Sequence, residues 1–284
     1  MGQQIAGKVV DIWGDNVQSV NLPGDHFRSK HDSLKMKLYN LANESRLPVN
    51  CEVFGCFSAC IPQQGLSRIE RGRQRQSIVP DFRFELPTPQ GRVSTLAELK
   101  TISFCQSYHY PGARKRGVEL RADSLPAEYL RKARETDRNF CDTGEGEVGP
   151  VERRLQNFPP LVKLVVGPFA ECSEDVHDLL NTMAECKTSY QCRSQGEVES
   201  EWKLASNLTY LRRQVSVCAV RAVADSLLAR LQHSGPPGRG AAQAARRRAE
   251  AMRREVRGRN ERAAHWLLHT RGYRVHNRGQ FLSN

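Results

Sequence analysis

Three charged side chains interrupt a segment that otherwise has the composition of buried β-structure. Residues 78–103 read IVPDFRFELPTPQGRVSTLAELKTIS, and Asp81, Glu98 and Lys100 stand among mostly apolar or β-forming residues. Burying a charged side chain is costly unless the charge is paired or binds a metal. These three side chains therefore either lie at a solvent-exposed edge or form a site together.

The segment predicts a β-hairpin whose register can be worked out. Strands over residues 77–86 and 93–102 flank the turn PTPQGR, and a turn symmetric about the 89–90 bond pairs Phe82 with Ala97. The same register sets Asp81 opposite Glu98, and Lys100 shares their face because side chains alternate along a strand. Opposed residues have Cβ atoms about 4.5–5.5 Å apart, a separation at which two carboxylates repel each other.

A divalent cation would remove this repulsion. Two carboxylates with several retained water molecules suit Mg²⁺, with Mn²⁺ as the alternative ion. A lysine on the same face would orient an attacking water molecule, or neutralise the charge that develops on a phosphate. Asp81, Glu98 and Lys100 together predict metal-dependent hydrolysis of phosphodiester bonds.

The sequence resembles the PD-(D/E)xK phosphodiesterase superfamily, which has the fold of restriction-type endonucleases. The resemblance rests on Pro80-Asp81 followed by Glu98-Leu99-Lys100 across the hairpin, and on the order of elements around it. It implies that Asp81 and Glu98 bind the metal and that the Leu99 carbonyl joins them. It also implies that Lys100 assists the attacking water. In many members a carboxylate on the first helix supplements the site, a place that Glu44 would take.

The elements that must position these residues are read from apolar periodicity and from breaks in it. A helix over 26–45, a strand over 49–57, the hairpin, a helix after Pro126 and a strand over 161–169 are expected, followed by two further helices. This order predicts an α/β fold. The resemblance implies a restriction-endonuclease-like core, helix–strand–strand–strand–helix–strand, with a mixed sheet flanked by helices. We expect an N-terminal extension over 1–25, this core over 26–170, a helical C-terminal extension over 171–233 and a basic tail over 234–284.

The positive charge of the chain is concentrated at its C-terminal end. The 284 residues carry a net charge of +12, and residues 234–284 hold twelve Arg, no Lys and three Glu. Such a balance predicts a polyanionic partner, DNA in preference to RNA. The tail is either a solvated, disordered segment or a polyanion-binding arm. No run approaches the roughly 18 apolar residues of a membrane span, and the N-terminus lacks a signal-peptide layout. We expect a nuclear or cytoplasmic location.

Further basic residues flank the hairpin and would meet the phosphates of a bound nucleic acid. Arg73 and Arg75 precede it, and Arg114, Lys115 and Arg116 follow it. Arg131 and Lys132 lie on the expected helix after Pro126.

Two other functions remain open at this point. The same fold could bind nucleic acid without cleaving it, if too few ligands hold the metal. Alternatively, the chain is a helical protein-interaction scaffold with a polybasic tail, in which the hairpin is only structural. The first would bind DNA without metal-dependent cleavage, and the second would bind DNA through the tail alone.

Overall fold

A computed structural model describes residues 4–5, 8–9, 26–53, 55–71, 78–103, 111–196 and 201–231. After a short hairpin of β1 (Gln4–Ile5) and β2 (Lys8–Val9), the order is α2 (His26–Glu44), β3 (Val49–Cys51), η1 (Ser58–Cys60), α3 (Gln63–Arg71), β4 (Phe82–Thr88), β5 (Gly91–Thr101), α4 (Pro111–Phe140), α5 (Pro150–Gln156), β6 (Val162–Val166), α6 (Glu174–Gln195) and α7 (Glu201–Leu231). The predicted basic tail, and most of the predicted N-terminal extension, lie outside the described residues.

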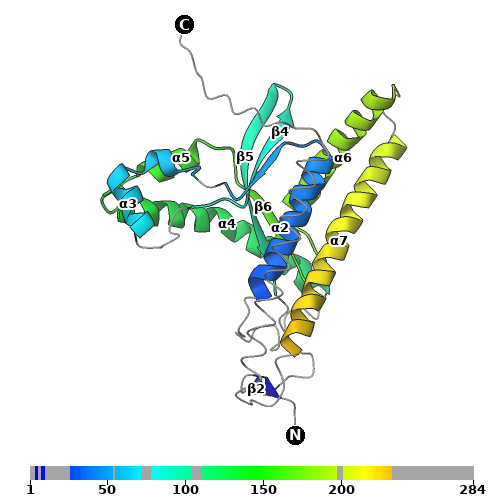
Figure 1. Ribbon diagram of the computed structural model, residues 1–284, viewed down its shortest axis with the longest axis horizontal. Coiled ribbons are helices and arrows are strands. Elements are labelled where there is room, and N and C mark those ends of the chain that lie inside the picture. Colours follow the sequence, from blue (N-terminus) through cyan, green and yellow to red (C-terminus); the bar gives the residue numbers. More distant parts are fainter. Residues whose placement is uncertain are drawn as a thin grey trace.

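The main sheet is mixed and has the strand order β3-β4-β5-β6. The first three strands pair antiparallel, and β6 pairs parallel to β5. The long connection from β5 to β6 contains α4 and α5, as a parallel pair requires. Helices cover both faces of the sheet (Figure 1). The expected α/β class, with a mixed sheet flanked by helices, is confirmed.

One face of the sheet packs against α2 and α6, and α7 closes this layer from outside. Leu38 of α2, Phe82 of β4 and Leu99 of β5 are fully buried in the shared core. Leu211 of α7 and Met183 of α6 belong to the same core, so both C-terminal helices pack directly on the layer that holds α2. Figure 1 shows α7 running alongside α2.

The opposite face packs mainly against α4, which is longer than the sequence predicts. The helix was expected to begin after Pro126 but starts at Pro111, with Pro126 inside it. An internal proline loses a backbone hydrogen bond and costs about 3 kcal/mol. Val118, Ala122 and Leu125 precede it and are buried against the sheet, and at about 1.5–3 kcal/mol for each large apolar side chain their burial offsets that cost.

The hairpin has the register that the sequence predicts, up to its last expected pair. Phe82 pairs with Ala97, Phe84 with Thr95 and Leu86 with Val93. The ladder ends at Phe82, so the expected pairing of Asp81 with Glu98 is not part of it. Pro80 explains the end of the ladder, because proline has no N–H to donate to a neighbouring strand.

Within the described residues, no helix is both long enough and apolar enough to cross a membrane. No described cysteine forms a disulfide.

Candidate functional site

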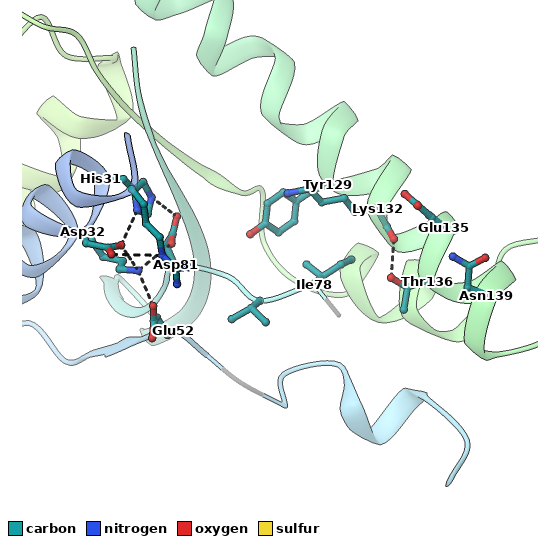
Figure 2. Close-up of a pocket in the computed structure, with 13 residues that line it drawn as sticks. His31, Asp32, Glu52, Ile78, Asp81, Tyr129, Lys132, Glu135, Thr136 and Asn139 are labelled. Atoms are coloured by element: carbon teal, nitrogen blue, oxygen red, sulfur yellow. Dashed lines mark hydrogen bonds and ion pairs between the residues drawn. The ribbon is translucent and has the colours of Figure 1, made fainter. Parts of the chain in front are cut away.

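A pocket of about 410 Å³ opens beside the start of β4, between α2 and α4. Charged side chains from α2 gather on one side of it, and α4 supplies the other side (Figure 2). It is lined by Arg28, His31, Asp32, Lys35, Glu52, Ile78, Val79, Asp81, Tyr129, Lys132, Glu135, Thr136 and Asn139. We call this the α2–α4 pocket.

Asp81 is fixed at the point where the strands separate. Its backbone carbonyl accepts a hydrogen bond from Glu52 N at 2.8 Å, and its carboxylate Oδ2 accepts one from Leu99 N at 3.0 Å. In a continued ladder, Leu99 would exchange backbone hydrogen bonds with residue 80. Pro80 cannot donate, and its own carbonyl accepts from Val53 N. The N–H and the carbonyl of Leu99 therefore bind side chains instead of the neighbouring strand.

His31 of α2 occupies the space next to these released groups. Its Nε2 lies 3.2 Å from Asp81 Oδ2 and 3.1 Å from the Leu99 carbonyl oxygen, and its Nδ1 lies 3.4 Å from Asp32 Oδ1. Both ring nitrogens therefore face acceptors, an arrangement that favours the doubly protonated ring. Burial opposes this charge, but hydrogen bonds to Asp32 and Asp81 outweigh it and raise the pKa of His31 to about 9.

Lys35, one helical turn further along α2, brings a second cation to the same carboxylates. Its Nζ lies 2.8 Å from Glu52 Oε1, 3.4 Å from Asp32 Oδ1 and 3.8 Å from Asp81 Oδ1. Burial alone would raise the pKa of Asp81, but His31, the Leu99 N–H and Lys35 together hold that pKa below its usual range. Arg28 Nε adds a third cation, 3.7 Å from Asp32 Oδ2. Three carboxylates thus face three cations, and the charges of this cluster balance.

Glu98 and Lys100 form a second polar group, on the α4 side of the sheet. Glu98 is only 5% exposed. Its Oε2 accepts a hydrogen bond from the Tyr129 hydroxyl at 2.5 Å, and its Oε1 accepts one from Lys100 Nζ at 2.5 Å. Burial and the neighbouring carboxylate raise the pKa of Tyr129 well above its usual range. Tyr129 therefore stays a hydrogen-bond donor to Glu98.

The two carboxylates of the expected cation site are neighbours with separate partners. Asp81 contacts α2 residues, whereas Glu98 contacts α4 and Lys100. The repulsion expected between them is thus offset by cations and donors that the hairpin alone does not reveal. Tyr129 joins the two groups, because it binds Glu98 and also lines the pocket with Asp81.

Glu44 is not brought to this cluster. It is the last residue of α2, thirteen residues beyond His31, which is about 20 Å along the helix axis. Its carboxylate accepts hydrogen bonds from Lys187 Nζ at 2.6 Å and from the Tyr210 hydroxyl at 3.3 Å. Glu44 thus ties the end of α2 to α6 and α7.

The basic residues predicted to bind nucleic acid are dispersed. Lys132 lines the α2–α4 pocket, and the exposed Arg131 pairs with Glu135 at 3.6 Å. Lys115 and Arg116 are exposed at the other end of α4, about 24 Å away. Arg114 stacks on Phe169 and lies 3.8 Å from Glu171. Arg73 and Arg75 lie outside the described residues.

Sequence reasoning missed His31, Lys35 and Tyr129. His31 and Lys35 are four residues apart, so they share one face of α2, and Lys35 lies next to the apolar Leu34. That polar pair beside an apolar stripe was the available signal. Tyr129 continues the stripe of Val118, Ala122 and Leu125, which becomes visible only when the helix is allowed to run through Pro126.

Within the described part of the chain, no group of three or more His, Cys, Asp or Glu side chains has the arrangement of a metal site. Comparisons of the chain with protein-family models, with curated proteins and with solved structures each gave no match.

Proposed function

We propose that the protein is a metal-dependent nuclease that hydrolyses phosphodiester bonds in DNA, with a restriction-endonuclease-like core. The observation that carries this proposal is the meeting of Asp81, the released Leu99 carbonyl and His31 at one point. The Glu98–Lys100 pair lies on the adjoining stretch of β5. The order α2, β3, β4, β5, α4, β6 around one mixed sheet adds support, because it is the order that the resemblance implies.

The residues at this point suit a divalent cation. Asp81 Oδ2 and the Leu99 carbonyl oxygen both lie within 3.2 Å of His31 Nε2, so they already surround a positively charged group. Carboxylate and carbonyl oxygens are the ligands that Mg²⁺ and Mn²⁺ accept, and an imidazole nitrogen is better tolerated by Mn²⁺. Asp81 and the Leu99 carbonyl would hold the ion in place of the His31 imidazolium, or together with His31 once its Nε2 has lost its proton. Glu98 is the further carboxylate that the resemblance implies.

A bound divalent cation would polarise the scissile phosphate and lower the pKa of a water molecule. The side chains would supply the other catalytic and positioning roles. Lys100 would orient the attacking water and stabilise the negative charge that develops on the phosphate. Glu98 and Tyr129 would hold the Lys100 ammonium in place, since Glu98 binds both of them. Lys132, stacked over the Tyr129 ring at 5.4 Å, would contact a neighbouring phosphate.

A specific observation favours the alternative of a nucleic-acid-binding module without catalysis. Both candidate carboxylates are already engaged, Asp81 by His31 and Lys35, and Glu98 by Lys100 and Tyr129. If these ion pairs persist when DNA is bound, no cation enters and no bond is cleaved. The fold would then serve docking only.

The two candidates separate in an assay on linear and circular DNA with Mg²⁺, Mn²⁺ or EDTA, for the wild type and Asp81→Asn. The nuclease proposal predicts cleavage by the wild type with metal alone, and its loss in the variant. It also predicts that Mn²⁺ raises the melting temperature of the wild type and not of Asp81→Asn, because an ion stabilises only the state that binds it. Binding of DNA without cleavage under any metal condition would favour the docking module.

A further inference from the structure

A second hollow, of about 430 Å³, lies at the far end of α2 from the candidate active site. Arg46 reaches it from the turn after α2, Arg92 from the tip of the β4–β5 hairpin, and Arg193 from the last turns of α6. Cys186, Tyr190 and Ser194 complete its lining. We call it the arginine hollow.

The three guanidinium groups are gathered without acidic partners. Among the described residues, none of the three forms an ion pair with a carboxylate, whereas Arg121 and Arg134 of α4 both do. Burial raises the pKa of the half-buried Cys186 thiol, and the charge of Glu185 acts in the same direction, while the charges of Arg92 and Arg193 oppose them. Three arginines that line one concave surface without an ion-pair partner attract an anion.

Arg46 is exposed, and its guanidinium is held by Tyr190. Its guanidinium stacks on the Tyr190 ring at 4.5 Å and donates a hydrogen bond to the Tyr190 hydroxyl at 3.1 Å. Its backbone has a φ of +62°, a left-handed conformation that is uncommon for a residue with a side chain. A stacked guanidinium loses little further freedom when it binds an anion, which favours binding.

We propose that the arginine hollow binds the phosphate backbone of a nucleic acid. Guanidinium groups match phosphate oxygens with two parallel hydrogen bonds. Three such groups on three separate elements suit a chain of phosphates better than a single small anion. The net charge of +12 also favours a negatively charged partner. The inference deepens the proposed function, and rests on it for the identity of the partner, by adding a second contact region to the same substrate.

The position of the hollow predicts how long the substrate must be. Glu44, the last residue of α2, lies about 20 Å along the helix axis from His31, and Arg46 follows in the turn just beyond it. At about 3.4 Å per base pair, a duplex needs roughly six to seven pairs to reach from one site to the other. Duplexes shorter than this cannot occupy both.

The test measures binding of a fluorescent duplex of about 24 base pairs by anisotropy, in EDTA, over a series of salt concentrations. The triple variant Arg46→Gln, Arg92→Gln, Arg193→Gln is compared with the wild type. Its matched control is Arg212→Gln, Arg213→Gln, Arg221→Gln, which removes the same charge from exposed positions on α7. We expect the first triple to weaken binding at least about 10-fold, and to reduce the slope of log K against log salt by about 2 to 3.

The proposal would be overturned if the wild type and the hollow triple variant bound the duplex with the same affinity and the same salt slope. It would also be overturned if the control triple variant lost as much affinity as the hollow triple variant. If the triple variant does not fold, Arg92→Gln alone, on the hairpin, should reduce the slope by about 1. Tighter binding of a phosphoserine peptide than of the duplex, lost in the same variant, would assign the hollow to another partner and also overturn it. Because no metal is present, absence of cleavage by the wild type bears only on the nuclease proposal.

Discussion

At the scale of single residues, the candidate site is organised by what Pro80 cannot do. A residue with an N–H at this position would extend the ladder and pair with Leu99. Pro80 ends the pairing, so that Asp81 Oδ2 takes the Leu99 N–H and His31 Nε2 meets the Leu99 carbonyl. One missing donor thus creates both a fixed carboxylate and a carbonyl that faces a side chain instead of the neighbouring strand.

The protonation of His31 gives a prediction about stability. Its pKa of about 9 in the folded protein lies above the usual value of 6.5 for a histidine, so its charge stabilises the fold fully below about pH 6.5. That contribution is lost as the pH rises through about 9. In EDTA, the wild type should lose about 1–3 kcal/mol of unfolding free energy relative to His31→Gln between about pH 6 and pH 9.5.

Urea unfolding at both pH values measures this difference, with His177→Gln, at an exposed position on α6, as the control for the substitution itself. A gap between wild type and His31→Gln that stays constant with pH would show that folding does not raise the pKa of His31.

At the scale of elements, α4 contributes to the candidate site through Tyr129, whose hydroxyl donates a hydrogen bond to Glu98. Tyr129→Phe would leave Glu98, a 5% exposed residue, without its buried hydroxyl donor. Losing a donor to a buried carboxylate costs about 1–3 kcal/mol. The free energy of unfolding of the variant, measured in urea, should therefore fall by about that amount. Tyr210→Phe removes an exposed hydroxyl that bonds to Glu44 and should cost less than about 0.5 kcal/mol. Equal, small losses in both variants would mean that Glu98 does not depend on α4.

The hairpin and its register could be predicted from the sequence because they depend on local alternation and turn residues. Phe82 and Ala97 pair as expected. The repulsion inferred between Asp81 and Glu98 was an incomplete guide. Lys100 of the hairpin itself pairs with Glu98, but the other partners of the two carboxylates come from elsewhere. His31 and Lys35 lie about 50 residues earlier in the chain, and Tyr129 lies about 30 residues later. Those contacts exist only once α2 and α4 pack on opposite faces of the sheet.

The predicted start of α4 and the predicted place of Glu44 in the site were wrong for related reasons. Pro126 is a valid local signal for a helix start, but burial of the preceding apolar stripe overrides it. Glu44 has the right residue type on the right helix. The separation along α2 that excludes it from the cluster depends on where His31 meets the sheet.

At the scale of the whole molecule, positive charge occurs at the pocket, at the far end of α2, and in a stretch of sequence outside the described residues. Lys132 lines the pocket, the arginine hollow lies at the other end of α2, and twelve arginines fall in residues 234–284. Such an arrangement would let affinity and cleavage be separated. Contacts far from the pocket contribute binding without taking part in the reaction.

Deleting residues 235–284 should therefore weaken DNA binding and flatten its salt dependence, since fewer counterions are released. Cleavage at low salt and saturating protein should survive. Anisotropy and gel-based cleavage assays on the same preparations check both halves. Complete loss of cleavage under those conditions would place the tail in the catalytic unit.

We propose that Lys100 takes part in the hydrolysis itself, beside a cation held by Asp81 and the Leu99 carbonyl. The most direct measurement is single-turnover cleavage of DNA with saturating enzyme and Mg²⁺ or Mn²⁺, for the wild type and Lys100→Ala. We predict that the variant keeps DNA binding and the metal-dependent rise in melting temperature. Its cleavage rate should fall by at least about 10²-fold, as is usual when one positioned catalytic group is lost. Cleavage by Lys100→Ala at the wild-type rate would show that Lys100 takes no part in the hydrolysis.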